Sequence, residues 1–377
     1  MNQEVTLIAT AAMGLESVVA QEVKALGYTD LKVENGRVQF NAEVSAIPRC
    51  NLWLRTADRV KVLVGQFEAK SFDELFEKTK ALPWESFIEE DGEFPVIGKS
   101  VKSKLYSVPD CQKIVKKAVV ERLKRKYGIA SWLKESGAFY RIEVSLLKDV
   151  AMLTIDTSGS GLHKRGYRVG QGEAPLKETL AAALIQLTNW KADFPFVDPF
   201  CGSGTIPIEA ALIGQNIAPG FNREFASEGW SLVGNKNWEK ALEEAEDLAN
   251  YDQPLTIVGS DIDHKMVEIA KDNAIEAGLG DLVIWKQMQV KDISPKQENG
   301  YLIGNPPYGE RLGDKPEVEK MYQDLGIAMK QHPSWSVYIL TSNEKFESLY
   351  GKQATKKRKL FNGFIKTDYY QYFGKHS

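Results

Sequence analysis

The stretch FPFVDPFCGSGTIPIE constrains the fold of this chain more than any other. Its apolar run from Phe194 to Val197 predicts a short strand, which Asp198 ends. The segment Gly202-Ser203-Gly204 predicts a tight loop, and the residues from Thr205 to Ile213 predict an amphipathic helix. A strand, a glycine turn and a helix in this order are typical of an α/β sheet that presents backbone N–H groups to a ligand at its carboxyl edge.

The two glycines of this loop allow the backbone to approach a bulky ligand, because no Cβ stands in the way. A Gly-x-Gly turn by itself is equally compatible with an ordinary tight turn. The third glycine of a dinucleotide-binding fingerprint would stand at position 207, where the chain has Pro207. The pattern therefore favours a smaller, nucleoside-type ligand over NAD.

The length of 377 residues predicts two or three domains, and a hydrophobic content of 43% is that of a globular protein. The net charge of −3 means that any basic surface must be local. Cys50, Cys111 and Cys201 form no CxxC pair, so we expect a reducing compartment and no metal site. The start lacks the basic region of a signal peptide, and no window of about 18 apolar residues could span a bilayer. These features predict a cytoplasmic protein without membrane contact, and we expect a monomer.

Strands and helices alternate twice near the start, which predicts a ferredoxin-like domain over residues 1–68. A less regular α+β half-domain fits the same pattern. The expected elements are Val5–Thr10, Glu16–Leu26, Gly36–Phe40, Ala46–Leu54 and Arg59–Glu68.

A second domain is expected over residues 69–160, opened by the capping box of Ser71 and Glu74. Between Lys99 and Lys126 it holds ten basic residues but only two acids, a bias that favours nucleic-acid binding. A solvated helix face is the alternative interpretation. The candidates for phosphate contacts on the helix that Ser107 opens are Lys113, Lys116, Lys117, Lys124 and Arg125.

The segment DTSGSGLHKRGYR, which follows two further strands, is glycine-rich and basic. It can be a plain linker, or it can contact RNA through Lys164, Arg165 and Arg168. We place a domain boundary here, so that a third domain covers residues 161–377. Its first helix is expected over Leu176–Trp190, with Pro175 in the first turn.

An acid follows the next buried strand of the third domain, LTIVGS, which ends in Asp261-Ile262-Asp263. Asp263 has the position of an N-cap for the helix that starts at His264. Asp261 is therefore the expected acceptor for both ribose hydroxyls of the ligand. An irregular insertion over Ile217–Asn235 and a charged helix separate this acid from the glycine loop.

The tetrapeptide Asn305-Pro306-Pro307-Tyr308 follows another predicted strand and is the most specific signal in the chain. Two prolines cannot continue a sheet, so they fix a bend and leave carbonyl groups unpaired by any ladder. The Asn305 side-chain oxygen and the Pro306 carbonyl can then accept hydrogen bonds from one exocyclic amine, and Tyr308 can stack on a base. This arrangement suits methyl transfer to an aromatic amine.

The motifs DPFCGSGT, GSDID and NPPYGERLG, in this order, resemble those of class I S-adenosylmethionine (SAM)-dependent amino-methyltransferases. The capping-box helix, the basic helix and DTSGSGLHKRGYR are similar to the THUMP-domain branch of that family, of the RlmL/YpsC type, which is linked to guanine-N2 methylation of 23S ribosomal RNA. The resemblance implies an α/β fold: a Rossmann-like methyltransferase domain with a seven-stranded sheet and one antiparallel strand, preceded by ferredoxin-like and THUMP domains.

The resemblance also implies roles for individual residues. Asn305, Pro306, Pro307 and Tyr308 match the catalytic tetrapeptide. Gln289 stands where many relatives have an acid that contacts the cofactor adenine; its amide oxygen can still accept, and Asp292 is the other candidate. The full set of expected cofactor-binding residues is Asp198, Phe200, Cys201, Gly202, Ser203, Gly204, Thr205, Asp261, Ile262, Gln289, Asp292 and Asn305.

These observations predict a SAM-dependent RNA methyltransferase that acts on an exocyclic base amine, guanine N2 of 23S ribosomal RNA. The alternatives are an adenine-N6 methylase of DNA or RNA, a tRNA guanine-N2 methyltransferase, and an RNA-binding assembly factor without activity. Asn305 argues against the last of these.

Overall fold

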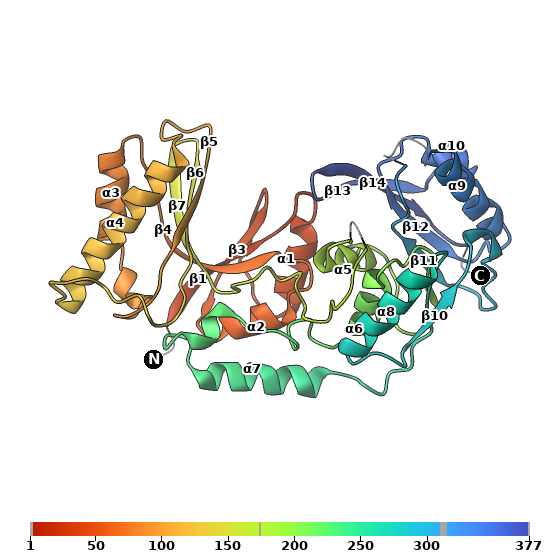
Figure 1. Ribbon diagram of the computed structural model, residues 1–377, viewed down its shortest axis with the longest axis horizontal. Coiled ribbons are helices and arrows are strands. Elements are labelled where there is room, and N and C mark those ends of the chain that lie inside the picture. Colours follow the sequence, from red (N-terminus) through yellow and green to blue (C-terminus); the bar gives the residue numbers. More distant parts are fainter. Residues whose placement is uncertain (1–2, 173–174, 310–314, 376–377) are drawn as a thin grey trace. The chain divides into compact units, whose positions relative to one another are not determined.

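The computed structural model describes residues 3–172, 175–309 and 315–375 (Figure 1). It contains two compact units. The first consists of residues 1–11, 19–162 and 224–245, and the second of residues 12–18, 163–223 and 246–377. The expected domain ranges were 1–68, 69–160 and 161–377. Residues 12–18 of the first range lie in the second unit, and residues 224–245 of the third range lie in the first unit.

The first unit is built on one continuous seven-stranded sheet in the order β2-β3-β1-β4-β7-β6-β5. Strand β4 (Arg59–Glu68) is its centre, because it pairs with β1 (Glu4–Thr10) through its first residues and with β7 (Val150–Asp156) along most of its length. The ferredoxin-like and THUMP segments thus share a single sheet. The remaining strands are β2 (Lys32–Glu34), β3 (Arg37–Glu43), β5 (Val96–Val101) and β6 (Ile142–Leu147).

Among the helices of the first unit, α3 (Phe72–Ala81) begins at a side-chain cap, whereas Ser45 before α2 (Ala46–Trp53) and Ser107 before α4 (Val108–Tyr127) make no cap hydrogen bond. The Ser71 side chain accepts a hydrogen bond from the Glu74 N–H at 3.2 Å, as expected for the start of α3. Helix α4 buries one stripe and ends at Gly128, whose φ of 68° is the left-handed cap conformation. Helices α1 (Glu16–Ala25) and α2 lie close to their predicted ranges.

The segment 224–245 packs within the first unit although it follows the glycine loop in sequence. Trp230 stacks on Tyr140 with ring centroids 4.8 Å apart, and its indole N–H donates to the Phe139 carbonyl at 3.0 Å. The Ser227 N–H donates to the Thr157 carbonyl. Residues 224–235 of the expected irregular insertion therefore belong to the first unit and lead into α7 (Asn235–Leu248), whereas residues 217–223 belong to the second unit.

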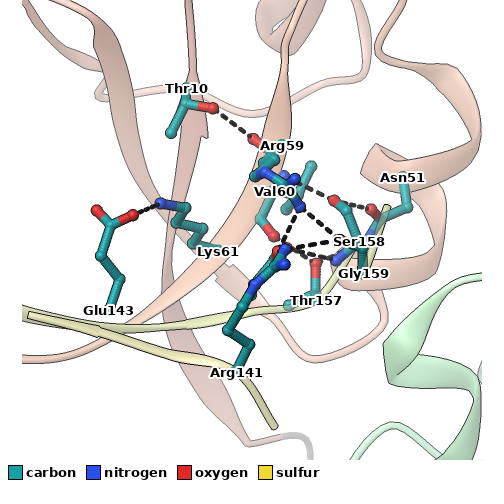
Figure 2. Close-up of polar contacts among 11 residues, drawn as sticks. Thr10, Asn51, Arg59, Val60, Lys61, Arg141, Glu143, Thr157, Ser158 and Gly159 are labelled. Carbon is teal, nitrogen blue, oxygen red and sulfur yellow. Dashed lines mark hydrogen bonds and ion pairs between the residues drawn. The ribbon is translucent and has the colours of Figure 1, made fainter. Parts of the chain in front are cut away.

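A buried carboxylate, Asp156, stabilises the join between β4, β6 and β7. Its Oδ2 accepts hydrogen bonds from the guanidinium groups of Arg59, at 2.6 Å, and Arg141, and the Gly159 carbonyl accepts from both as well (Figure 2). The buried Lys61 pairs beside it with Glu143 at 2.9 Å. Burial of these charges is tolerated because each has a partner of opposite sign.

We expect Asp156→Ala to lower the free energy of unfolding of the first unit by about 2–3 kcal/mol, since its hydrogen bonds from Arg59, Arg141 and the Ser158 N–H are lost. Chemical denaturation followed by tryptophan fluorescence measures this change. Glu68→Ala is the control, because Glu68 and its partner Lys70 are both exposed. Equal midpoints for the two variants would contradict the role assigned to Asp156.

The second unit contains a seven-stranded sheet in the order β10-β9-β8-β11-β12-β14-β13. All pairs are parallel except those of β14, which runs antiparallel to β12 and β13. The predicted Rossmann-like sheet with one antiparallel strand is confirmed. Its strands are β10 (Val283–Gln287), β9 (Ile257–Asp261), β8 (Phe196–Asp198), β11 (Tyr301–Gly304), β12 (Ser336–Thr341), β14 (Ile365–Tyr372) and β13 (Lys356–Asn362).

Alternate side chains of this sheet enter two separate cores. Phe196 and Ile303 pack with α5 (Glu178–Gln186), α6 (Thr205–Gly214) and α8 (His264–Glu276). Their neighbours Val197 and Leu302 pack with α9 (Lys315–Lys330) and α10 (Phe346–Tyr350) on the other face. The helices thus cover both faces, as a parallel sheet requires.

Two predictions about these helices are wrong. Helix α6 is not amphipathic, because the residues from Thr205 to Leu212 are all buried. Helix α5 starts at Glu178 rather than at Leu176, and Pro175 lies before it. In the described ranges no helix is long and apolar enough to cross a bilayer.

Candidate active site

The glycine loop leaves the carboxyl end of β8 with two residues in left-handed conformations, Gly202 (φ 51°) and Gly204 (φ 86°). A Cβ on Gly204 would lie 2.7 Å from the Trp285 ring and 2.9 Å from the Ala270 Cβ. Glycine is therefore required at position 204 both by the backbone angle and by the packing against α8 and β10.

Asp198 holds the start of this loop through a hydrogen bond to its backbone. Its Oδ1 accepts a hydrogen bond from the Phe200 N–H at 2.9 Å, and its side chain is 1% exposed. Burial raises the pKa of this carboxyl well above its usual range, and the Phe200 hydrogen bond opposes that shift. The structure therefore favours a role in loop geometry over direct contact with a ligand.

Asp261 joins the ends of two neighbouring strands. Its Oδ2 accepts a hydrogen bond from the Gly202 N–H at 3.0 Å, and its Oδ1 accepts from the Asp263 N–H at 2.9 Å. Burial raises the pKa of this carboxyl. Asp263 accepts from the Lys265 N–H at 2.9 Å and is the N-cap of α8. The carboxylate expected to bind ribose thus lies against the glycine loop.

The residues expected near the cofactor base follow β9 and β10. Ile262 exposes 65% of its surface directly beyond Asp261, which makes it an apolar platform beside a carboxylate. The Met288 N–H donates to the Asp261 carbonyl at 2.9 Å and so holds the next segment close. Gln289 precedes a short 3₁₀ turn that Asp292 ends, and both are exposed.

The tetrapeptide Asn305-Pro306-Pro307-Tyr308 follows β11, which pairs in parallel with β8 and so ends at the same edge as the glycine loop. The Tyr308 hydroxyl donates to the Asn305 Oδ1 at 2.7 Å. The Tyr322 hydroxyl, from α9, donates to the Pro307 carbonyl at 2.8 Å. The bend is therefore held by side chains where the β-ladder stops. The motif residues Glu310–Gly313 lie outside the described residues.

The basic residues of α4 divide into two groups. Lys113, Lys117 and Arg125 are exposed, and Lys124 is half-buried. Among the described residues none of these four forms an ion pair within 4 Å. Lys116 instead pairs with Glu135 at 2.7 Å and lies 3.6 Å from the Phe94 ring centroid, so much of its charge is neutralised.

Two of the predicted RNA contacts are corrected by the structure. Arg165 is 2% exposed and pairs with the buried Glu209 at 3.1 Å, so it offers no surface to RNA. Arg168 donates to Glu178, to the Ser203 Oγ and to the Thr205 Oγ1, which makes it a brace for the glycine loop. Lys164, by contrast, is exposed and remains a candidate.

Sequence reasoning missed Asn273 and Asn362. The Asn273 amide of α8 donates to the carbonyls of Ser203 and Gly170, both at 2.9 Å, and so ties the glycine loop to α8. The Asn362 amide, at the end of β13, donates to the Tyr308 hydroxyl at 3.1 Å. The Asn362-Gly363 pair is a hairpin signal that could have placed this residue at a turn, but its contact with Tyr308 is tertiary.

The described residues fit SAM as a ligand. The site offers Asp261 for ribose hydroxyls, the exposed Ile262 for an apolar base and a glycine loop without Cβ atoms beside them. If the strands of this sheet are counted in chain order, with β8 as 1 and β14 as 7, their spatial order is 3-2-1-4-5-7-6. This order, together with these groups and the Asn-Pro-Pro-Tyr bend at the carboxyl edge, defines a class I SAM-dependent methyltransferase.

Comparison with known proteins assigns the chain to a family. Residues 165–371 match the methyltransferase domain described as RMKL-like, residues 6–61 match the RlmL ferredoxin-like domain, and residues 69–156 match the THUMP domain. The chain belongs to the THUMP-containing, RlmL-like family of SAM-dependent methyltransferases.

Three relatives illustrate the similarity. The chain is 68% identical to the "Putative RNA methyltransferase YpsC" of Bacillus subtilis, over 98% of this chain and 96% of that protein. A structure described as "SMU.472, a putative methyltransferase complexed with SAH" is 49% identical, with a TM-score of 0.96 and full coverage of both chains. The "Ribosomal RNA large subunit methyltransferase K/L" of Syntrophotalea carbinolica is 33% identical over 97% of this chain, which spans 53% of that relative.

We expect Asp261→Ala to weaken SAM binding by roughly 1.5–3 kcal/mol, the range for hydrogen bonds to a charged group. Calorimetry on the folded variant measures this. Asp263→Ala is the control, because Asp263 caps α8 and should leave cofactor affinity near that of the wild type. The reverse ranking would move the ribose contact to Asp263.

Proposed function

We propose that this protein methylates an exocyclic base amine of RNA, most specifically guanine N2 of 23S ribosomal RNA, as a cytoplasmic monomer. The observation that carries the proposal is the Asn305–Tyr308 bend at the sheet edge, next to the glycine loop. The names of the YpsC and K/L relatives support RNA as the substrate class and ribosomal RNA within it. The THUMP segment supports RNA as well.

The mechanism follows from what the tetrapeptide can do. SAM, when bound, supplies an electrophilic methyl group. Asn305 Oδ1 and the Pro306 carbonyl accept hydrogen bonds from the target amine, which draws its lone pair out of conjugation and toward the methyl carbon. As the C–N bond forms and the C–S bond breaks, the amine becomes cationic, and both acceptors stabilise that charge. The cationic amine then loses a proton to water, so no carboxylate or imidazole base is needed.

A base in a helix must leave its stack to reach this bend, at a cost of a few kcal/mol. The Tyr308 ring offers a face for the extruded base. Recognition of RNA away from the target nucleotide falls to exposed cations, foremost Lys113 and Lys117 on α4.

We expect Asn305→Ala to reduce methyl transfer by on the order of 10²–10³, because its hydrogen bond strengthens as the amine becomes cationic. RNA and cofactor affinities should change by only a few-fold. Single-turnover kinetics at saturating SAM measures the chemical step. Tyr308→Ala should instead weaken capture of the base, since stacking is worth about 1–3 kcal/mol.

Methylation of total RNA and of DNA with labelled SAM, followed by nucleoside analysis, tests the substrate. N2-methylguanine in 23S ribosomal RNA is the expected product. N2-methylguanine in tRNA, or N6-methyladenine in either nucleic acid, would establish one of the alternatives. A wild-type rate for Asn305→Ala would contradict the catalytic assignment and favour an assembly factor.

The contribution of α4 to RNA binding is tested by a matched pair of double charge reversals. The double variant Lys113→Glu with Lys117→Glu should weaken RNA binding. The slope of the logarithm of the binding constant against the logarithm of salt concentration is negative, and its magnitude should fall by about 1.4–1.8, the value for two lost phosphate contacts. Lys236→Glu with Lys240→Glu, exposed at the same i,i+4 spacing on α7, should leave the slope unchanged. Identical slopes for both double variants would show that the α4 lysines form only a solvated face.

A further inference from the structure

A directional chain of hydrogen bonds connects the β13–β14 turn to the catalytic tetrapeptide. The Asn362 Nδ2 donates to the Tyr308 hydroxyl oxygen at 3.1 Å, and the Tyr308 hydroxyl donates its hydrogen to the Asn305 Oδ1 at 2.7 Å. Asn362 is the last residue of β13 and Asn305 is the first residue after β11, so the chain of hydrogen bonds connects two separate segments through one hydroxyl.

The direction of this chain matters because the two ends of an amide group have the same shape but opposite hydrogen-bonding character. Only the Oδ1 of Asn305 can accept a hydrogen bond from a target amine, whereas its NH2 group would present hydrogen to hydrogen. A half-turn about the last side-chain bond exchanges the two ends. Some neighbour must therefore hold the oxygen in place.

Tyr308 can hold it because a hydroxyl has one hydrogen to donate. Since Asn362 donates to the Tyr308 oxygen, that hydrogen is directed to Asn305, where it needs an acceptor. The Asn305 Oδ1 accepts it with one lone pair and keeps a second lone pair for the amine. Whether the side chain at position 362 donates to or accepts from the Tyr308 hydroxyl thereby determines which end of the Asn305 amide faces Tyr308.

The backbone of Asn362 is held by the β13–β14 ladder. It pairs with Ile365 at the end of the β13–β14 ladder, and Gly363 makes the turn with a φ of 61°. The backbone of the tetrapeptide has a separate anchor, the Tyr322 hydroxyl on the Pro307 carbonyl. Asn362 is therefore not needed to hold the bend, and its contact acts on the Tyr308 hydroxyl.

We propose that Asn362 is a positioning residue for methyl transfer, which fixes the Asn305 side-chain oxygen toward the target amine through the Tyr308 hydroxyl. The inference rests on the proposed function of the tetrapeptide and deepens it. It assigns a task to the Tyr308 hydroxyl that is separate from stacking by the Tyr308 ring.

The variant that tests it is Asn362→Asp, which keeps the shape but reverses the polarity. A carboxylate only accepts, so the Tyr308 hydroxyl turns its hydrogen toward position 362 and its oxygen accepts from the Asn305 NH2 group. We expect the single-turnover rate at saturating SAM and RNA to fall on the order of 10²-fold, as for other misplaced polar groups. A nearby negative charge acting on its own would stabilise the cationic amine and raise the rate, which is the opposite sign. Asn189→Asp, an exposed substitution in the same unit, is the control for the added charge.

The decisive measurement repeats Asn362→Asp in a Tyr308→Phe background, where no hydroxyl transmits the polarity. The Asp substitution should then change the rate by less than about threefold, since the coupling between the two positions is gone. Equal losses in both backgrounds, or a wild-type rate for Asn362→Asp with intact Tyr308, would overturn the role of Asn362. A wild-type enzyme that methylates no RNA at all would instead overturn the proposed function.

Discussion

The hydrogen bond between the Gly202 N–H and the Asp261 carboxylate is the interaction on which the site depends. It joins the residues that follow β8 and β9, two adjacent parallel strands whose carboxyl ends meet at one edge of the sheet. The left-handed backbone at Gly202 aims that N–H at the carboxylate. The same carboxylate holds the Asp263 N–H and so sets the start of α8. One partly buried carboxylate thus holds both the glycine loop and the start of α8.

Linear motifs predict this edge well because the relevant groups lie next to strand ends. Asp198, Asp261 and Asn305 each follow an apolar run, and parallel strands bring their ends together whatever the intervening sequence. Seven strands with a single antiparallel one were expected from the resemblance, and the sheet confirms them. Local signals such as the Ser71 cap and the strand Arg59–Glu68 were also sufficient.

Tertiary partners explain what the sequence could not predict. Arg165 and Arg168 sit in a basic segment, but Glu209 and Glu178, which neutralise them, come from helices later in the chain. Composition alone cannot distinguish a buried ion pair from a surface cation. The segment around Trp230 presents the same problem, because its stacking partner Tyr140 belongs to a strand-rich region far earlier in the sequence. The RNA contact expected of Arg165 is contradicted by such a tertiary partner, whereas the insertion around Trp230 is irregular as expected and only its packing partner was unforeseen.

The tetrapeptide shows how a short motif depends on distant support. Two prolines set the bend, yet they leave both the Pro307 carbonyl and the Asn305 amide without ladder partners. The Tyr322 hydroxyl of α9 is the partner of the Pro307 carbonyl, and the Tyr308 hydroxyl, which accepts from Asn362 of β13, is the partner of the Asn305 side chain. The first partner fixes the backbone, and the second acts through a hydroxyl that has a single hydrogen. Because an amide can turn end for end with little change in shape, the backbone anchor cannot determine which atom meets the substrate. That choice needs a donor whose own direction is fixed, and a side chain at the end of a β-ladder supplies it.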